Sequence, residues 1–387
     1  MKRGFFGAFA LLSTVVSSAA TSPTMAVSTP DGPIAMPTVG LGSAFGFTPP
    51  GSTDVAYNAT LLWLQNGGRS VHTAWMYCNQ PAIGRAVADF LASSSNNNSS
   101  GGGGSGSVTR ADLWIESMLP PWQMGYNETK KSFADTLAQL GVEYLDLYMF
   151  HWPGVFVSNL PMEPSKHVET CGVPVTQVPA CKVGQRSWAK CRLDSWRAML
   201  ELQAAGKIRA LGTSNFEVPQ LRQLLAASEA LGRGGALAVN QVENHIGYHD
   251  DYLQAWCASH GIAQQAYSPL GSGAIATSKD PVVLAAAAKH NVSTAQVGLR
   301  FLAQSGLSVV PKAGTTAYQL ENLGIFSFAL EDAEMAALGA LAQPYGRGVQ
   351  DGMSQMCIEE ATGYMARCIY LDEEDSSSAS GLWEAEN

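Results

Sequence analysis

The feature that most constrains the fold is an alternation that runs along most of the chain. Short runs of β-branched and aromatic residues are followed, repeatedly and in the same order, by longer stretches with apolar residues at helical spacing. Such alternation is typical of parallel strands joined by crossover helices. The runs that predict strands are 38–43, 70–74, 112–118, 144–151, 208–214, 238–243, 262–268 and 307–311. Eight strands of this kind predict an α/β protein with a closed (β/α)8 TIM barrel.

Two of the stretches between these runs carry clear helix boundaries. Over 128–140 the apolar residues Phe133, Leu137 and Leu140 recur at helical spacing, and Gly141 follows as a C-terminal stop. Ser293 and Gln296 form a capping box at the start of a later helix. Both helices are expected to turn one apolar stripe toward the barrel.

Composition limits the class of protein and its partners. The chain has 387 residues, of which 46% are hydrophobic and 14% charged, so it has enough apolar surface to bury a large core. The formal net charge is -9, and no run of lysines or arginines interrupts the acidic balance. Because a nucleic-acid-binding surface needs basic side chains to neutralise phosphates, nucleic acid is not an expected partner.

The N-terminal residues, 1–24, have the layout of a signal peptide. Lys2 and Arg3 precede an apolar run over 5–16, and small residues follow at 17–20. The run is too short to anchor the chain in a bilayer, so no stable membrane insertion is expected after the leader is removed. Sequons at Asn58, Asn97, Asn98, Asn127 and Asn291 agree with the secretory pathway, either secretion or the endoplasmic reticulum. A bipartite plastid leader, which also begins with a signal-like segment, is the alternative.

The barrel is expected over residues 30–345. Two segments within it and one after it do not follow the alternation of strands and helices. The Ser, Asn and Gly tract at 93–107 predicts a flexible surface loop. The proline-rich insertion at 154–191 follows a strand end and so lies on the face where barrel loops build active sites. Residues 346–387 form a C-terminal extension whose acidic, serine-rich tail is expected to be disordered.

The cysteines allow disulfides without fixing their pairing. Cys171, Cys181 and Cys191 lie in the insertion, and Cys357 and Cys368 lie near the C-terminus. The alternative is a metal site. No two cysteines are separated by only two residues, and no histidine pair completes a ligand set, so no metal is expected.

Five motifs follow one another along the chain between about residues 37 and 341. They are Val39-Gly40-Leu41-Gly42, the stretch 206–216 that ends in Ser214-Asn215-Phe216, Asn240-Gln241-Val242-Glu243, the stretch 266–271, and Val310-Pro311-Lys312. In sequence and in order they resemble the motifs of the aldo-keto reductase family. The resemblance implies a nicotinamide cofactor, NADPH with NADH as a second possibility, bound at the barrel mouth without a Rossmann fold. It also implies a small-molecule carbonyl substrate, and a monomer is the default expectation.

The resemblance further implies which residues hold the cofactor. Amide and hydroxyl groups orient the carboxamide, and an aromatic face fixes the side of the ring that delivers hydride. By role the matching residues are Ser214, Asn215 and Gln241 at the carboxamide, Tyr267 on the ring, Ser268 and Leu270 along the pyrophosphate, Lys312 at the 2′-phosphate, Glu321 and Asn322 at the adenine, with Gly42 and Ser43 also in the site. The family's serine after the lysine is Ala313 here, and its arginine is Tyr318. Both changes weaken discrimination between NADPH and NADH.

The catalytic positions depart further from the family. There an aspartate, a tyrosine, a lysine and a histidine act together: tyrosine donates a proton, lysine lowers the tyrosine pKa, aspartate pairs with lysine, and histidine orients the substrate. The matching residues here are His72, Tyr77, Met118 and His151. Losing one ionic partner would strand a buried charge, whereas losing both predicts a neutral site with Met118 as an apolar filler. His72 is either a barrel residue without a catalytic part or, as an imidazolium, a substitute for the lysine.

Two functions remain open at this point. The first is an NAD(P)H-dependent oxidoreductase that reduces aldehydes or ketones, with Tyr77 as the acid and His151 as the orienting donor. The second is a catalytically impaired barrel that binds NADP(H) or a carbonyl ligand as a sensor or scaffold. The intact cofactor motifs favour the enzyme, and the absent lysine and aspartate favour the binding protein.

Overall fold

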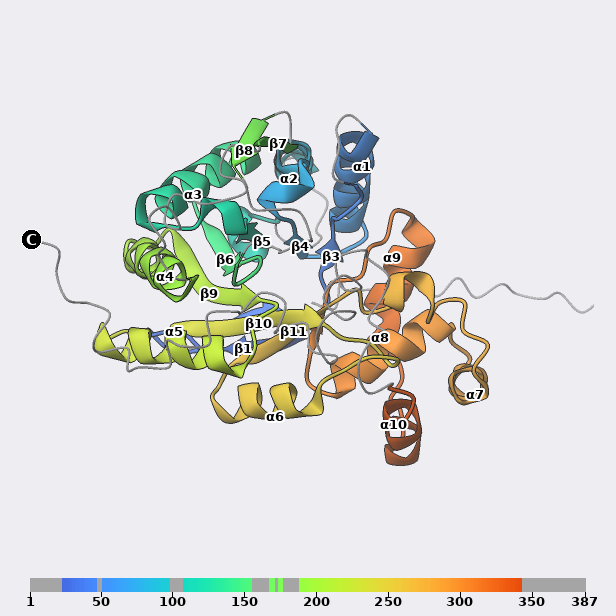
Figure 1. The fold of residues 1–387 in the computed structure, drawn as a ribbon. Helices are drawn as coiled ribbons and strands as arrows, with labels where there is room; N and C mark the ends of the chain where they lie inside the picture. The colour runs from blue at the N-terminus through green and yellow to red at the C-terminus, as the bar shows by residue number, and fades with distance from the viewer. Residues whose placement is uncertain are drawn as a thin grey trace, which may run out of the picture.

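Parallel strands curl into a barrel at the centre of the molecule (Figure 1). The computed structural model describes residues 23–46, 51–97, 107–154, 167–170, 173–176 and 188–342. In these ranges the main sheet has eight strands in the order β12-β11-β10-β9-β6-β5-β4-β3. The sheet closes because the Gly40 nitrogen donates to Val309 O at 2.9 Å and the Val309 nitrogen donates to Thr38 O at 2.8 Å. The predicted TIM barrel is confirmed.

The strands of the barrel coincide with the runs that predicted them, with ends that differ by at most three residues. Their bounds are β3 Leu41–Gly42, β4 Ser70–His72, β5 Trp114–Leu119, β6 Leu145–Phe150, β9 Ile208–Ser214, β10 Leu237–Glu243, β11 Ala263–Tyr267 and β12 Ser308–Val309. Two segments of backbone approach each other closely where β3 meets the segment after β12. A Cβ at Gly42 would lie 2.4 Å from Val310 O, so only glycine permits this approach.

Helices surround the barrel, as Figure 1 shows. Their bounds are α1 Gly51–Gln65, α2 Gln80–Asn97, α3 Tyr126–Leu140, α4 Trp188–Ala204, α5 Val218–Ala230, α6 Asp251–Ser259, α7 Pro281–His290, α8 Thr294–Gln304, α9 Thr316–Leu323 and α10 Asp332–Gly339. Gly141 ends α3 with a φ of 64°, and the Ser293 hydroxyl caps α8, so both predicted boundaries are confirmed. In the described ranges no helix is both long and apolar enough to cross a membrane.

An antiparallel hairpin that the sequence analysis missed covers one end of the barrel. It consists of β1 (Thr24–Val27) and β2 (Ile34–Pro37), so the leader expected over 1–24 overlaps the hairpin at Thr24. Val27 and Met36 are buried against interior residues of the barrel, among them Leu147 and Ala238. The dipeptide Asp31-Gly32 in the connecting turn, where Gly32 has a φ of 110°, is a hairpin signal that could have revealed it.

The two insertions begin or end differently from the predictions. Helix α2 continues through Asn97, so 93–97 are helical rather than loop. The hydroxyls of Ser93 and Ser95 donate to Phe90 O and Leu91 O, which satisfies these polar side chains within the helix. The segment 154–191 contains a hairpin of β7 (His167–Thr170) and β8 (Val173–Thr176), and its last four residues belong to α4.

Several predicted features lie outside the described residues. They are the leader over 1–22, the loop over 98–106, Cys171, Cys181, Cys357, Cys368 and the C-terminal extension 346–387.

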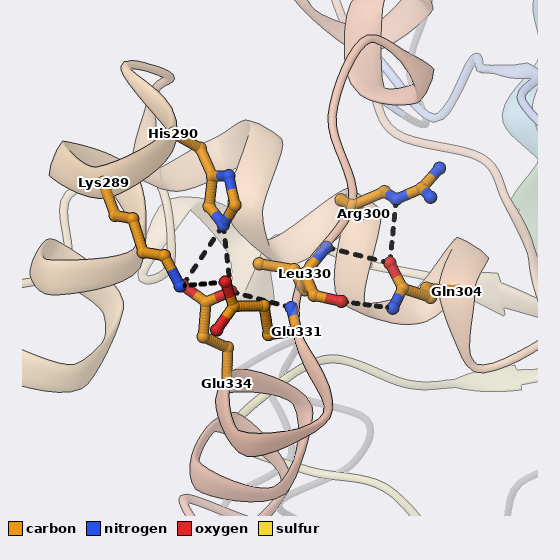
Figure 2. Close-up of polar contacts among 7 residues, drawn as sticks. All are labelled: Lys289, His290, Arg300, Gln304, Leu330, Glu331 and Glu334. Carbon is orange, nitrogen blue, oxygen red and sulfur yellow. Dashed lines mark hydrogen bonds and ion pairs between the residues drawn. The ribbon is translucent and has the colours of Figure 1, made fainter.

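Helix α10 is fastened to the barrel helices by a polar cluster (Figure 2). His290 Nε2 lies 2.9 Å from Glu334 Oε2, and Lys289 Nζ lies 2.8 Å from Glu331 Oε1, so both residues at the end of α7 pair with the start of α10. The side chain of Gln304 donates to Leu330 O at 2.7 Å and accepts from the Leu330 nitrogen at 3.0 Å. The cluster fixes the last described helix from two sides.

Candidate active site

The barrel brings the four predicted catalytic positions to neighbouring strands. His72 ends β4, Tyr77 ends the 3-10 turn η1 (Trp75–Tyr77), Met118 lies in β5 and His151 directly follows β6. Met118 is fully buried and belongs to an apolar cluster against which Tyr77 packs. It fills the interior space as predicted for an apolar filler.

Tyr77 lies between two imidazole rings. Its ring centroid is 6.1 Å from that of His72 and 5.6 Å from that of His151, and both contacts are edge to face. The turn that carries Tyr77 is fixed by Asn79, whose Nδ2 donates to Ser43 O at 2.7 Å and whose Oδ1 accepts from Thr73 Oγ1 at 3.0 Å. The tyrosine is therefore held in position by buried hydrogen bonds.

His151 is neutral across the physiological pH range. Burial, with a smaller contribution from the nearby charge of His72, lowers its pKa to about 3. Its Nδ1 is buried and has no hydrogen-bond partner among the described atoms. A neutral imidazole can donate one hydrogen bond to a substrate oxygen without carrying a charge into the site.

Sequence comparison with the family missed a buried carboxylate next to His72. Glu116 of β5 is fully buried, and its Oε1 lies 3.2 Å from His72 Nδ1. Its Oε2 accepts hydrogen bonds from Trp114 Nε1 at 3.0 Å and from Gln265 Nε2 at 3.4 Å. The prediction of a neutral site did not take this carboxylate into account. A charged residue inside an otherwise apolar strand was the available signal, because lone buried carboxylates are rare.

The residues expected around the nicotinamide form a continuous polar strip at the ends of β9, β10 and β11. Tyr267 Oη donates to Asn215 Oδ1 at 2.9 Å, and Asn215 Nδ2 lies 3.1 Å from Ser214 Oγ. Gln241 Nε2 donates to Gln265 Oε1, which links this strip to the glutamine that contacts the buried carboxylate. The structure thus brings these four predicted cofactor residues together.

The residues expected at the rest of the cofactor lie where β3 and β12 end. Lys312 Nζ donates to Ala44 O at 3.2 Å, directly after Ser43. Ser43 Oγ is buried and has no partner among the described atoms, so it is available to a phosphate oxygen that reaches this turn. Ser268, with a φ of 46°, and Leu270 belong to the turn after β11.

At the adenosine end, helix α9 carries two predicted cofactor residues, Glu321 and Asn322, in different surroundings. Asn322 is buried, whereas the Glu321 carboxylate accepts from Ser293 Oγ at 2.8 Å and is thereby held against the start of α8. Tyr318, which stands in place of the family's arginine, is 61% exposed. The donor set fits a nicotinamide nucleotide, with Lys312 as the cation expected at its phosphate end.

Metal ligands do not gather in the described parts of the chain. There, no group of three or more His, Cys, Asp or Glu side chains is arranged to hold a metal ion.

Comparison with known proteins agrees with this arrangement. The model of the Aldo/keto reductase family matches residues 38–343. Glycerol 2-dehydrogenase (NADP(+)) of Saccharomyces cerevisiae is 32% identical over 299 residues, which cover 77% of this chain and 86% of that protein. Glyoxal reductase of Bacillus subtilis is 32% identical over 278 residues, which cover 72% of this chain and 80% of that protein. The structure of the aldose reductase from Schistosoma japonicum superposes with a TM-score of 0.65 at 28% identity, covering 88% of this chain and 98% of that one.

Proposed function

This chain belongs to the aldo-keto reductase family, and from this premise we propose that it reduces a small aldehyde or ketone with NADPH through an altered proton relay. The observation that carries the proposal is the position of Tyr77 between the rings of His72 and His151. In this relay Tyr77 is the acid, neutral His151 orients the carbonyl, and His72 replaces the family's lysine.

The chemistry divides between the cofactor and the chain. NADPH, when bound, supplies a hydride that forms the new C–H bond at the carbonyl carbon. The carbonyl oxygen takes the proton of Tyr77 Oη, so that an alcohol leaves and a tyrosinate remains until solvent or His72 returns a proton. His151 donates a hydrogen bond to the same oxygen, which places it next to the phenol. The polar strip of Ser214, Asn215 and Gln241 holds the carboxamide.

The cofactor side favours a protein that binds NADP(H), as the enzyme does, over a barrel that binds only a carbonyl ligand. A barrel that only binds a carbonyl ligand has no need for the hydrogen-bonded strip of Tyr267, Asn215 and Ser214 at its mouth. Lys312 supports NADPH, and the substitution of arginine by Tyr318 supports some use of NADH as well.

We also propose that the protein matures in the secretory pathway as a monomer with disulfide bonds at Cys78 and Cys191. The sequon residues Asn58, Asn127 and Asn291 are exposed, which supports glycosylation. Cys257 is the free cysteine of the described residues, and burial raises the pKa of its thiol to about 12, so it is unreactive. A mobility shift after glycosidase treatment tests the compartment, and a thiol count without reductant tests the disulfides. Unmodified asparagines and seven free thiols would refute both.

The central experiment measures NADPH oxidation by the purified full-length mature protein with a reactive aromatic aldehyde. We expect measurable turnover that falls at least about 100-fold in Tyr77→Phe, because the placed acid is lost. NADPH binding, followed by fluorescence, should be the same in both proteins. The double variant His72→Asp, Met118→Lys restores the family's ion pair. If only this variant turns over, the natural chain is a binding protein and the proposal fails.

A further inference from the structure

A buried carboxylate, that of Glu116, lies beside the buried imidazole of His72, and the His72 ring contacts the ring of Tyr77. Resting on the function proposed above, we propose that Glu116 is a positioning residue that holds His72 as an imidazolium beside the Tyr77 ring. The charged pair His72 and Glu116 then does for the tyrosine what the missing lysine and aspartate do elsewhere in the family.

The sheet itself fixes the pair. His72 and Glu116 are register partners on the adjacent strands β4 and β5, and His72 Nδ1 lies 3.2 Å from Glu116 Oε1. Both side chains are almost wholly buried, at 3% and 0% exposed. Water therefore does not screen the two groups, so each strongly influences the charge of the other.

The hydrogen bonds of Glu116 indicate that it is a carboxylate. Trp114 Nε1 and Gln265 Nε2 are N–H donors, and both point at Oε2 of Glu116. An oxygen that accepts two such bonds is favoured in the ionised form, because a protonated carboxyl has less capacity to accept. In the described part of the chain, the group that can supply the opposite charge to this carboxylate is the imidazole of His72.

One positive charge at this place suits Tyr77, and the surroundings allow only one. The groups that face the His72 ring are Glu116 from β5, Tyr77 from η1 and His151, which follows β6. Burial and the charge of His72 keep His151 neutral, and Met118 brings no charge. A cation whose ring centroid lies 6.1 Å from that of the phenol favours the phenolate, which eases proton donation to a substrate oxygen.

The carboxylate is also joined to the cofactor side of the barrel. Gln265 Nε2 donates to Glu116, and Gln265 Oε1 accepts from Gln241, which is expected to hold the carboxamide. Glu116 is thus oriented by the same glutamine that orients a cofactor residue.

The test removes the charge of Glu116 while keeping its shape. In Glu116→Gln we expect kcat at neutral pH to fall at least about 10-fold with little change in the KM for NADPH, because the loss is of proton donation and not of cofactor binding. In a His72→Asn background the same substitution should cause no further loss. Additive losses in the double variant would show a structural role and overturn the proposal. Glu116→Asp, which keeps the charge, should retain kcat within about 3-fold.

Asp146 provides a matched control. It is another fully buried carboxylate of the barrel, paired with Arg110 and Arg209 at 2.8 and 2.7 Å near the start of β6. Asp146→Asn should lower the thermal midpoint and leave kcat at neutral pH close to that of the natural protein. An equal fall of kcat in Asp146→Asn would show that loss of any buried carboxylate has this effect and would overturn the proposal.

A second readout separates this inference from the proposed reductase function. Nitrogen NMR of histidine-labelled protein, with the His72 signals assigned from His72→Asn, reports the charge of the ring without turnover. We expect an imidazolium at neutral pH in the natural protein and a neutral ring in Glu116→Gln. If turnover is absent but this difference is seen, the reductase proposal fails and the role of Glu116 stands. If the ring has the same charge in both proteins, the role of Glu116 is refuted even where turnover is seen.

Discussion

Asn215 donates a hydrogen bond from Nδ2 to the main-chain oxygen of His151, at 3.0 Å. The same side chain accepts from Tyr267 Oη at 2.9 Å. One amide therefore joins a residue expected at the nicotinamide ring to the residue proposed to orient the substrate. It does so from a left-handed backbone conformation, with a φ of 62°.

Two substitutions of Asn215 separate the effect of its backbone conformation from the effect of its side-chain hydrogen bonds. Both Asn215→Gly and Asn215→Ala remove the bonds and should weaken NADPH binding. Only alanine also opposes the positive φ, so Asn215→Ala should be less stable than Asn215→Gly by roughly 1 kcal/mol. Denaturant unfolding of the three proteins measures this difference. An alanine variant as stable as the glycine variant would contradict the assignment of strain.

The phosphate end of the cofactor site should respond to a restored arginine. Tyr318→Arg places a guanidinium on an exposed position of α9, where it can bind a 2′-phosphate together with Lys312. We expect NADPH to bind about 10-fold more tightly and NADH to bind as before. Tyr252→Arg, at a 68% exposed position on α6, adds the same charge elsewhere and controls for net charge. Equal gains for both cofactors would show that Tyr318 is not near the 2′-phosphate.

Glu217, the N-cap of α5, makes stability depend on pH near neutrality. Burial, with a contribution from Asp250, raises the pKa of its carboxyl to about 7. A carboxyl whose pKa is raised on folding stabilises the folded state most at pH values below the pKa that it has in the unfolded chain. This contribution is lost as the pH rises through the folded pKa of about 7. Glu217→Gln should therefore be more stable than the natural protein at pH ~8, with little difference at pH ~4.

Equilibrium unfolding at the two pH values measures this effect. Glu229→Gln, at an exposed position near the other end of α5, should show no such dependence. A Glu217→Gln protein with the same pH profile as the natural one would contradict the prediction.

The fastening of α10 should weaken in acid. Burial raises the pKa of the Glu334 carboxyl, but hydrogen bonds from the Glu331 nitrogen and from His290 outweigh it, so the pKa lies below its ordinary value. A lowered pKa contributes stability above the unfolded value, and this is lost as the pH falls through the folded value. We expect lower protection factors over α10, measured against the intrinsic exchange rate at each pH, at low pH and in Glu334→Gln at neutral pH (Figure 2). Protection factors unaffected by either change would show that contacts other than those of Glu334 hold the helix.

Local patterns predicted the barrel, because each strand and each helix cap depends on a few adjacent residues. Gly141 and Ser293 are examples, and both mark the expected helix ends. The hairpin of β1 and β2 was not predicted because the signal-peptide pattern extends to residue 24, where the hairpin begins. The role of Glu116 depends on contacts with His72 and with Gln265, which is 149 positions away. These side chains meet only when the barrel closes. Family motifs identify which residue occupies each known position, and they do not reveal a new partner such as Glu116.

The hydrogen bond between Gln265 and Glu116 also bears on how such a site can be altered. We propose that residues of β9 to β12, the cofactor wall, arrange hydride delivery and that residues on β4 to β6 arrange proton delivery. The bond between Gln265 and Glu116 links the two groups through their side chains. A designer who wishes to change how the protein supplies protons can leave the cofactor wall as it stands, provided that position 116 keeps an acceptor for the Gln265 amide or that Gln265 is changed with it.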